Sequence, residues 1–329
     1  MNNFIEVKNL DVFFPVHKDM FSKKKYVYAV NNVNLTIKKQ SIVGLVGESG
    51  SGKTTTGQAI LKIIEPTNGE IRINNCVFGA DKKQDKLMRK KNQIIFQDPY
   101  SSLNPQKTIR ASLETPMIVH GIGENAKDRY ERIKNILNSV GLDVDILDRK
   151  PAGFSGGQLQ RICIARALLL KPEFVVLDES IASLDVSIQA QIINLLKELK
   201  DKYSLTYLFI SHNIAVLKYL CDEIGVMYLG KIVEYGKTKQ MFEKPLHPYT
   251  KMLLGSVPIA EPQKERYRIK NSDCTGETPS PMNLPTGCSF SNRCHYATEI
   301  CTTVIPEDEY IGEYRVACHR NKEINFSDN

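Results

Sequence analysis

The 329-residue sequence has no tryptophan and no long apolar run, and the second absence excludes a membrane-spanning segment. The longest candidates, Phe174–Leu177 and Leu205–Ile210, fall far short of the roughly 18 apolar residues that cross a bilayer. They are typical of buried strands. The first residues lack a basic segment followed by an apolar one, so we expect no signal peptide. We therefore expect an intracellular or peripheral protein that forms no pore by itself.

The chain also has few cysteines and a small net charge. Eight cysteines are too few for a disulfide scaffold over this length, which leaves metal binding or simple burial as their roles. Lys+Arg 44 against Asp+Glu 37 gives a net charge of +7. This excess is modest and its basic residues are scattered, so we expect no nucleic acid as a partner. The 42% hydrophobic and 25% charged residues exclude a disordered, collagen-like or coiled-coil chain.

Hydrophobic periodicity predicts an α/β fold. Phe4–Val7 and Val33–Ile37 look like short strands of an antiparallel sheet, and Gly69–Phe78 like a further pair. Residues from about 107 to 170 are mostly helical in pattern. The segment 174–211 then reads as strand, helix and strand, which implies a parallel sheet. Because the length exceeds the roughly 250–300 residues of a single growing core, we expect one large domain plus a smaller one.

The clearest motif follows a predicted strand, Ser41–Val46, and opens a predicted helix, Thr54–Ile64. It fits the pattern G-x-x-x-x-G-K-[ST] with the residues Gly47, Glu48, Ser49, Gly50, Ser51, Gly52, Lys53 and Thr54. Such glycines let the backbone wrap closely round phosphate oxygens, and the start of the helix adds partial positive charge. Lys53 is expected to reach the β- and γ-phosphates, and Thr54 to hold Mg²⁺.

An apolar strand that ends in two acids predicts the second half of this site. Asp178 at the tip of Phe174–Asp178 is placed to hold Mg²⁺, directly or through water. Glu179 is placed to polarise an attacking water. Either acid alone could be a solvated strand end, but the phosphate-loop motif upstream favours a nucleotide site.

Five further segments, which follow one family's order along the chain, together resemble that family, the ATP-binding cassette (ABC) ATPases. Tyr28 resembles the aromatic residue that stacks on adenine, although Tyr26 is an alternative. Gln97 is similar to the Q-loop glutamine, and His212 to the switch histidine. The signature sequence and the D-loop are matched by Ser155, Gly156, Gly157, Gln158 and by Ser183, Leu184, Asp185.

The resemblance implies a RecA-like P-loop core with an antiparallel β subdomain and an α-helical subdomain at about 98–170, all within residues 1–255. It implies ATP and Mg²⁺, with Gln97 also near the metal and with Gln97, Glu179 and His212 in catalysis. The signature residues and Asp185 then serve the ATP of a partner cassette. Ser180 departs from the family, which usually has proline there.

The last part of the chain, 256–329, contains five of the eight cysteines, four of them between residues 288 and 318. Its segment Gly287–Cys294 and Cys318 with His319 resemble the C-terminal extension of oligopeptide/dipeptide importer ATPases. In several members that extension binds a [4Fe–4S] cluster, which here would involve Cys288, Cys294, Cys301 and Cys318. One Zn²⁺, with His295 or His319 as substitutes, or unligated thiols in a small core remain alternatives. Cys76, Cys163 and Cys221 are expected to pack in the interior, and Cys274 is unassigned.

This resemblance predicts an ATPase that powers import of oligopeptides or dipeptides from the cytoplasmic face of the membrane. The implied partners are a second ATPase subunit in a heterodimer, two membrane permease subunits and, indirectly, an extracytoplasmic peptide-binding protein. Asp98–Pro105 and Asp185–Gln191 look more like the second, "F", ATPase of such systems than the "D" paralogue. The alternatives are a nickel importer ATPase, a soluble ABC ATPase acting on nucleic acid or ribosomes, and a metal- or redox-sensing module.

Overall fold

A computed structural model describes residues 3–16, 25–78, 81–256 and 278–324. Its contacts divide the chain into two compact units that interleave in sequence. Unit 1 holds residues 1–3, 38–42 and 75–210, and unit 2 holds residues 4–37, 43–74 and 211–329. Cys274, to which the sequence assigns no role, lies outside the described residues.

Unit 1 contains three parallel strands. β6 (Phe174–Asp178) pairs on one side with β5 (Asn92–Ile95) and on the other with β7 (Thr206–Ile210). β6 and β7 are buried throughout, as the apolar sequences predict. The helix α7 (Val186–Tyr203) connects them, which confirms the predicted strand–helix–strand unit.

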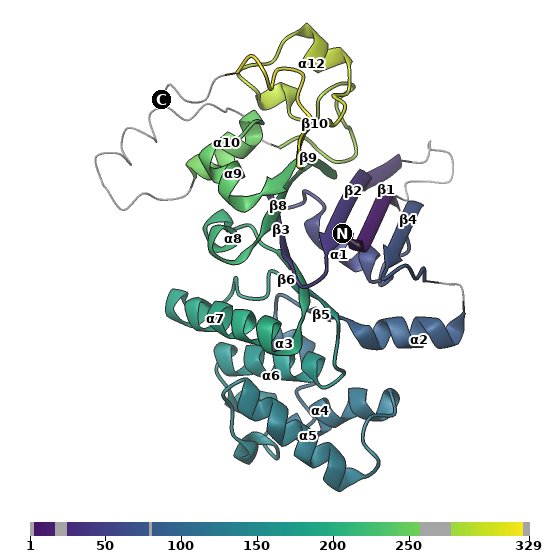
Figure 1. The fold of residues 1–329 in the computed structure, drawn as a ribbon, viewed down its shortest axis with the longest axis vertical. Coiled ribbons are helices and arrows are strands. Elements are labelled where there is room, and N and C mark those ends of the chain that lie inside the picture. Colours follow the sequence, from purple (N-terminus) through teal and green to yellow (C-terminus); the bar gives the residue numbers. More distant parts are fainter. Residues whose placement is uncertain (1–2, 17–24, 79–80, 257–277, 325–329) are drawn as a thin grey trace. The chain divides into compact units, whose positions relative to one another are not determined.

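The helices of unit 1 are grouped round α6 (Gly156–Leu168), which contacts α7, β5 and the helices before it (Figure 1). The remaining elements of this unit are α2 (Lys82–Lys91), α3 (Pro99–Ser102), α4 (Ile109–Val119), α5 (Ala126–Ser139), η1 (Val144–Ile146) and η2 (Pro151–Gly153). The elements from α4 onward confirm the predicted helical segment at about 107–170. The short helix α3 forms at the start of the implied helical subdomain, because Asp98 caps it with two hydrogen bonds and Pro99 suits its first turn.

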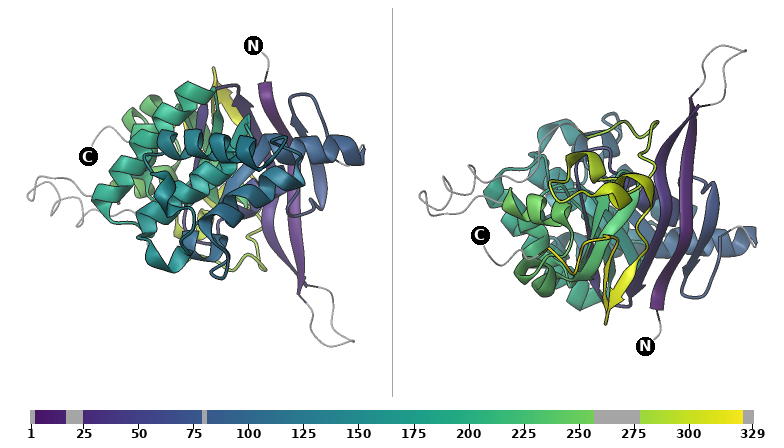
Figure 2. Two further views of the ribbon diagram at one scale, coloured as in Figure 1. Left: turned by 90° about the horizontal axis from the view of Figure 1, so that it is seen from below. Right: turned by 90° about the horizontal axis from the view of Figure 1, so that it is seen from above.

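Unit 2 contains a three-stranded sheet in the order β2 (Lys25–Lys38), β1 (Asn3–Val16), β4 (Asn68–Ile73), with β4 antiparallel to β1. Figure 2 shows the two long strands, coloured purple, side by side. Both are longer than the predicted strands, because their exposed faces carry polar residues that hide the strand pattern. The predicted strand pair at 69–78 is wrong: only β4 forms, and the chain turns at Asn74 and Asn75, which have positive φ.

A second group of strands in unit 2 begins with β3 (Ile42–Val46), which runs parallel to β8 (Glu223–Tyr228). β8 pairs antiparallel with β9 (Lys231–Lys237), β9 with β11 (Tyr314–Val316), and β11 with β10 (Glu309–Ile311). The helices of unit 2 are α1 (Lys53–Ile60), α8 (Ile214–Leu220), α9 (Thr238–Glu243), α10 (Pro248–Gly255) and α12 (Glu299–Thr303), with the short turn η3 (Ser291–Arg293). The cysteine-containing tail therefore extends the sheet of the same unit that holds the phosphate-loop motif.

The buried Glu234 joins this tail to the end of the cassette. Its carboxylate accepts hydrogen bonds from the backbone N–H groups of Leu246 (2.6 Å) and His247 (3.1 Å) and from the hydroxyl of Tyr314 (2.5 Å). These bonds fix β9, the start of α10 and β11 to one another.

Candidate nucleotide site

The phosphate-loop motif of unit 2 lies between the buried strand β3 and helix α1, the context that the motif requires. Gly52 has a φ of 101°, and a Cβ atom there would lie 2.2 Å from the carbonyl oxygen of Ala29, so only glycine fits. The Ser51 N–H donates to the Glu48 carbonyl at 3.2 Å, and the Gly230 N–H donates to the Ser51 carbonyl at 3.0 Å. The loop is thus held in a tight turn from both sides.

Lys53 is buried inside this loop. Its ammonium donates to the carbonyl oxygens of Gly47 and Glu48, at 2.9 Å each, and to the hydroxyl of Ser51 at 3.3 Å. Thr54 follows it, exposed on the first turn of α1. A fixed positive charge beside a helix N-terminus favours an anion at this point.

Tyr28 lies in β2, on a segment that borders the loop. It immediately precedes Ala29, the residue whose carbonyl oxygen faces Gly52. The half-buried Tyr28 ring meets the ring of Phe13 edge-on, with 4.8 Å between the ring centroids. Unit 2 therefore brings the predicted adenine-stacking residue next to the phosphate loop.

His212 lies in the same unit and is exposed. The preceding residue, Ser211, donates its N–H to the carbonyl of Leu45 in β3, at 3.1 Å. The Ser211 hydroxyl accepts the N–H of Asn213, which in turn caps α8. These bonds place His212 beside the end of the strand that leads into the phosphate loop.

Asp178 and Glu179 lie in unit 1, at the carboxyl end of β6. Asp178 is buried, whereas Glu179 is half-buried and has a φ of 45°, which is rare for a residue other than glycine. Its N–H donates to the carbonyl of Ile210 in β7 at 2.9 Å. A backbone held in an unusual conformation is common at functional sites.

Gln97 lies near these acids within unit 1. It is exposed and follows β5, in which Ile95 pairs with Leu177 of β6. Since β5 and β6 are parallel, Gln97 and Asp178 both extend from the same edge of the sheet. Gln97, Asp178 and Glu179 therefore all lie at the carboxyl ends of two neighbouring strands of unit 1.

The signature residues open α6. Ser155 and Gln158 form a reciprocal capping box, in which the Ser155 hydroxyl accepts the Gln158 N–H and the Gln158 amide oxygen accepts the Ser155 N–H. A Cβ atom on Gly157 would lie 2.7 Å from the Cγ2 of Ile188. This close approach brings the start of α6 beside the start of α7, which Asp185 precedes, and Ser155, Gln158 and Asp185 are all exposed.

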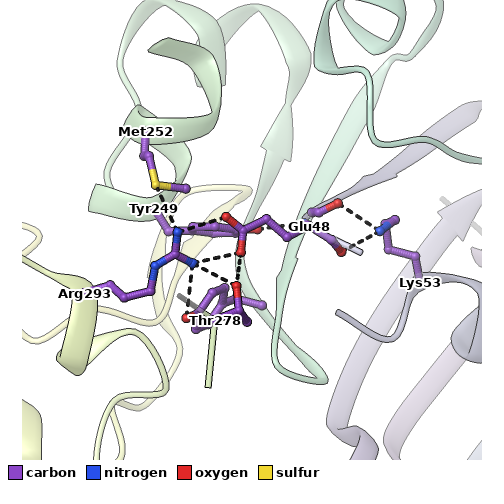
Figure 3. Close-up of polar contacts among 8 residues, drawn as sticks. Glu48, Lys53, Tyr249, Met252, Thr278 and Arg293 are labelled. Carbon is purple, nitrogen blue, oxygen red and sulfur yellow. Dashed lines mark hydrogen bonds and ion pairs between the residues drawn. The ribbon is translucent and has the colours of Figure 1, made fainter. Parts of the chain in front are cut away.

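Sequence reasoning missed the residues that bind the side chain of Glu48 in the phosphate loop. Figure 3 shows Arg293 on one side of Glu48 and Lys53 on the other. Arg293 forms two hydrogen bonds with the Glu48 carboxylate, and Thr278 forms a third. The only sequence signal was a charged residue inside the cysteine-containing segment Gly287–Cys294.

Four cysteines predicted to hold a cluster line one small cavity in unit 2, together with Phe290 and His319. They are Cys288, Cys294, Cys301 and Cys318. Burial, with a contribution from neighbouring cysteines, raises the pKa of Cys288 to about 11 and that of Cys318 to about 12. These two thiols therefore stay protonated at neutral pH, and a metal that bound them as thiolates would displace their protons.

Within the described part of the chain, no group of three or more His, Cys, Asp or Glu side chains is arranged to hold a metal ion. No disulfide joins the described cysteines. The ring of His319 lies 2.9 Å from the carbonyl oxygen of Val304. As expected, Cys163 and Cys221 are buried, whereas Cys76 is only partly so.

Comparison with known families gives two matches along the chain. The ABC transporter family matches residues 30–182. The family described as the C-terminal region of oligopeptide/dipeptide transporters matches residues 233–301.

Several curated relatives match nearly the whole chain. It is 42% identical to the oligopeptide transport ATP-binding protein AppF of Bacillus subtilis, over 96% of each chain. It is 44% identical to the dipeptide transport ATP-binding protein DppF of Haemophilus influenzae, over 94% of each chain. It is 38% identical to the di/tripeptide transport ATP-binding protein DppF of Pseudomonas aeruginosa, over 98% of this chain and 99% of that one.

Solved structures match the cassette. The ATP-binding cassette MJ0796, a dimer bound to ADP and Pi in a post-hydrolysis state, is 29% identical with a TM-score of 0.62, over 71% of this chain and 98% of that one. The cbiO1 component of an ABC transporter from Clostridium perfringens is 24% identical with a TM-score of 0.63, over 74% of this chain and 92% of that one. The fold is therefore that of an ABC cassette.

Proposed function

The chain belongs to the ABC transporter ATPases that carry the oligopeptide/dipeptide transporter C-terminal region, and from this we propose that it energises the import of oligopeptides or dipeptides. The observation that carries the proposal is the similarity to peptide transport ATP-binding proteins over almost the full length, tail included. Two of the relatives named above are DppF proteins and one is AppF, which favours the F-type subunit. None of these three is named for nickel.

In this proposal, ATP binds at the phosphate loop. Tyr28 stacks on the adenine, while Lys53 and the loop N–H groups at positions 47–54 bind the phosphates. Thr54, Gln97 and Asp178 hold Mg²⁺, which when bound neutralises charge on the β- and γ-phosphates. Glu179 accepts a proton from the attacking water, and His212 contacts the γ-phosphate.

A second ATPase subunit completes the site. The exposed Ser155 and Gln158 and the half-buried Gly156 and Gly157, at the N-terminus of α6, suit the γ-phosphate of an ATP held by the partner. Val186, the residue after Asp185, is 81% exposed at the start of α7. We propose a heterodimer in which each subunit completes the other's site.

Membrane permease subunits are the other partners. The structure has no helix, among the residues it describes, that is long and apolar enough to span a bilayer. Unit 1 instead exposes four large apolar side chains around the Q-loop and α4, namely Phe96, Tyr100, Ile118 and Val119. This group supports a docking site for permeases on the cytoplasmic face of the membrane. An extracytoplasmic binding protein delivers the peptide, and nucleic acid has no role.

For the tail we propose a [4Fe–4S] cluster held by Cys288, Cys294, Cys301 and Cys318, with Zn²⁺ as the alternative. Four thiols around one cavity fit a thiolate-ligated group, although no three described side chains fit a single metal ion. Anaerobic purification followed by iron, sulfide and zinc analysis tests the proposal. About four iron atoms and four sulfide ions per chain support the cluster, as the composition of a [4Fe–4S] group requires. Zinc without iron contradicts it.

The test of function is uptake in cells that lack the chain. Restoring the wild-type chain should restore uptake of labelled dipeptides and longer peptides, whereas Lys53→Ala should not, because phosphate binding is lost. Labelled Ni²⁺ is measured in parallel. Restored nickel uptake without peptide uptake would replace the proposed substrate. Salt-sensitive binding to DNA or ribosomes, with no effect on uptake, would favour a soluble ABC ATPase.

A further inference from the structure

The carboxylate of Glu48 in the phosphate loop is held by the cysteine-containing tail. Arg293 donates from Nη1 to Oε2 at 2.8 Å and from Nη2 to Oε1 at 3.0 Å, and Thr278 donates its hydroxyl to Oε2 at 2.5 Å (Figure 3). The Arg293 side chain is only 10% exposed and that of Glu48 29%. A two-pronged guanidinium–carboxylate pair of this kind fixes orientation as well as charge.

The backbone of Glu48 is held as well. Its N–H donates to the hydroxyl of Tyr249 at 2.9 Å, and its carbonyl accepts from the ammonium of Lys53 at 2.9 Å. Both the side chain and the peptide groups of this loop residue therefore depend on residues at 249, 278 and 293. The conformation of the phosphate loop is set in part from outside the motif.

Arg293 is in turn positioned by a loop that begins and ends in cysteine, residues 288–294, here called the cysteine loop. The Ser291 N–H donates to the Cys288 carbonyl, and the Arg293 N–H to the Phe290 carbonyl, at 3.0 Å each. The Cys288 and Cys294 side chains at its two ends line the small cavity described above. The guanidinium also lies over the rings of Tyr228 and Phe290, 5.8 and 5.7 Å from their centroids. The cysteine loop therefore connects Arg293 to two residues whose side chains line the cavity.

The negative charge of Glu48 links its contact with Arg293 to the affinity of the loop for ATP. Burial raises the pKa of Glu48, but the hydrogen bonds from Arg293 and Thr278 outweigh burial and lower that pKa below its ordinary value. The carboxylate is therefore ionised in a loop that binds a polyanion. Without Arg293, its negative charge repels the phosphates.

We propose that Arg293 is a positioning residue for ATP: it holds and neutralises Glu48, so that the cysteine loop sets the affinity of the phosphate loop for ATP. This inference rests on the proposed binding of ATP at that loop and gives the tail a role in it.

The test measures ATP affinity in the full-length chain by equilibrium titration with a fluorescent ATP analogue, without hydrolysis. Arg293→Gln should weaken binding by about tenfold, because it leaves Glu48 uncompensated. Adding Glu48→Gln to that variant should restore most of the affinity, which loss of structure alone does not explain. The matched control is Arg315→Gln, because Arg315 is 8% exposed and pairs with Asp308 at 3.1 Å. It should lower the thermal midpoint and leave ATP affinity unchanged.

The same titration tests the link to the cysteine loop. Cys294→Ala should weaken ATP binding in the wild-type chain. In the Arg293→Gln, Glu48→Gln double variant it should have no further effect, because the contact between Arg293 and Glu48 is already lost. Cys76→Ala is the control. Cys76 belongs to unit 1, and this variant should leave ATP affinity unchanged in both backgrounds. Equal losses from Cys294→Ala in both backgrounds would overturn this part of the inference.

Unchanged affinity in Arg293→Gln, or a double variant as weak as Arg293→Gln alone, overturns the proposal. If Arg293→Gln is unfolded, Arg293→Lys replaces it. That variant keeps the charge but loses one prong of the pair, and we expect binding about threefold weaker; wild-type affinity again overturns the proposal. Failure of the proposed function looks different, since a wild-type chain that binds ATP no better than Lys53→Ala refutes nucleotide binding itself.

Discussion

Two buried serines differ in whether their hydroxyl groups have a partner. The Oγ of Ser180, next to Glu179, has none among the described residues, whereas the Oγ of Ser211 accepts the N–H of Asn213 at 3.0 Å. A buried hydroxyl without a hydrogen bond costs free energy. Ser180→Ala should therefore stabilise the chain by about 0.5–1 kcal/mol, and Ser211→Ala should destabilise it by about 1 kcal/mol.

Urea unfolding of the two variants beside wild type measures both changes. Opposite signs are the expected result. A loss of stability in Ser180→Ala similar to that in Ser211→Ala would show that the Ser180 hydroxyl is satisfied in solution.

Two neighbouring glycines in the signature sequence differ in the space around them. A Cβ atom on Gly157 meets the Cγ2 of Ile188 at 2.7 Å, and one on Gly156 meets the Cδ2 of Leu184 at 3.2 Å. The branched Ile188 cannot turn that methyl away as easily as Leu184 can move its side-chain end. Gly157→Ala should cost about 1–3 kcal/mol in unfolding free energy, and Gly156→Ala markedly less.

Thermal unfolding of both alanine variants distinguishes packing from phosphate binding, because no nucleotide is present. Equal midpoints for the two would contradict the close contact between α6 and α7. The signature glycines would then be required only for the ligand.

Residue identities in the nucleotide motifs were predictable, whereas the partner of Glu48 was not. The phosphate-loop residues lie within one short stretch, so their spacing predicts phosphate binding, whereas the roles of Tyr28, Gln97 and His212 rest on the resemblance to the ABC ATPases. Glu48 and Arg293 are 245 residues apart, and many other acid and base pairs would satisfy the same charge rule. Only the packing of the tail against the cassette end selects this pair.

Helix α10 begins with a histidine that acts as its N-cap. The Nδ1 of His247 accepts the N–H of Tyr249 at 3.1 Å, and the side chain is fully buried. Burial lowers the pKa of His247 to about 3, from the usual 6.5. Between these two values the unfolded chain binds a proton that the folded chain does not.

Stability should accordingly fall as the pH drops through 6.5 towards 3. At pH 5 this histidine should contribute about one proton taken up on unfolding, or about 1.4 kcal/mol of unfolding free energy per pH unit. His247→Asn keeps an acceptor in the capping position and removes the titration. Its unfolding free energy, measured in urea from pH 4 to 6, should fall less steeply than that of wild type by that amount. Parallel curves would show that His247 is not held neutral.

Elements buried on both faces were the most predictable. β6 and β7 are continuous apolar runs, and the apolar residues at helical spacing between them predict α7. The long strands β1 and β2 were underestimated, because one face of each is partly exposed and polar. The pairing of β11 with β9 could not be read from sequence, since strands of three residues carry almost no periodicity.

The two compact units of the chain are not consecutive in sequence, because each combines segments that are far apart along the chain. The predicted boundary near residue 255 rested on a change in composition, whereas the compact units interleave, and the tail shares unit 2 with the phosphate loop. Composition reports where a segment stops resembling its neighbour. It does not report which distant strand that segment will join. A tail built onto the sheet behind the phosphate loop is well placed to influence nucleotide binding.

The proposed activity of the whole molecule is ATP hydrolysis at a site in which Glu179 activates water. The most direct measurement is phosphate release by the assembled transporter in lipid, with a partner ATPase whose own site is inactive. Glu179→Gln should bind ATP as wild type does and hydrolyse it at least about a hundredfold more slowly. Hydrolysis at the wild-type rate by this variant would contradict the central claim.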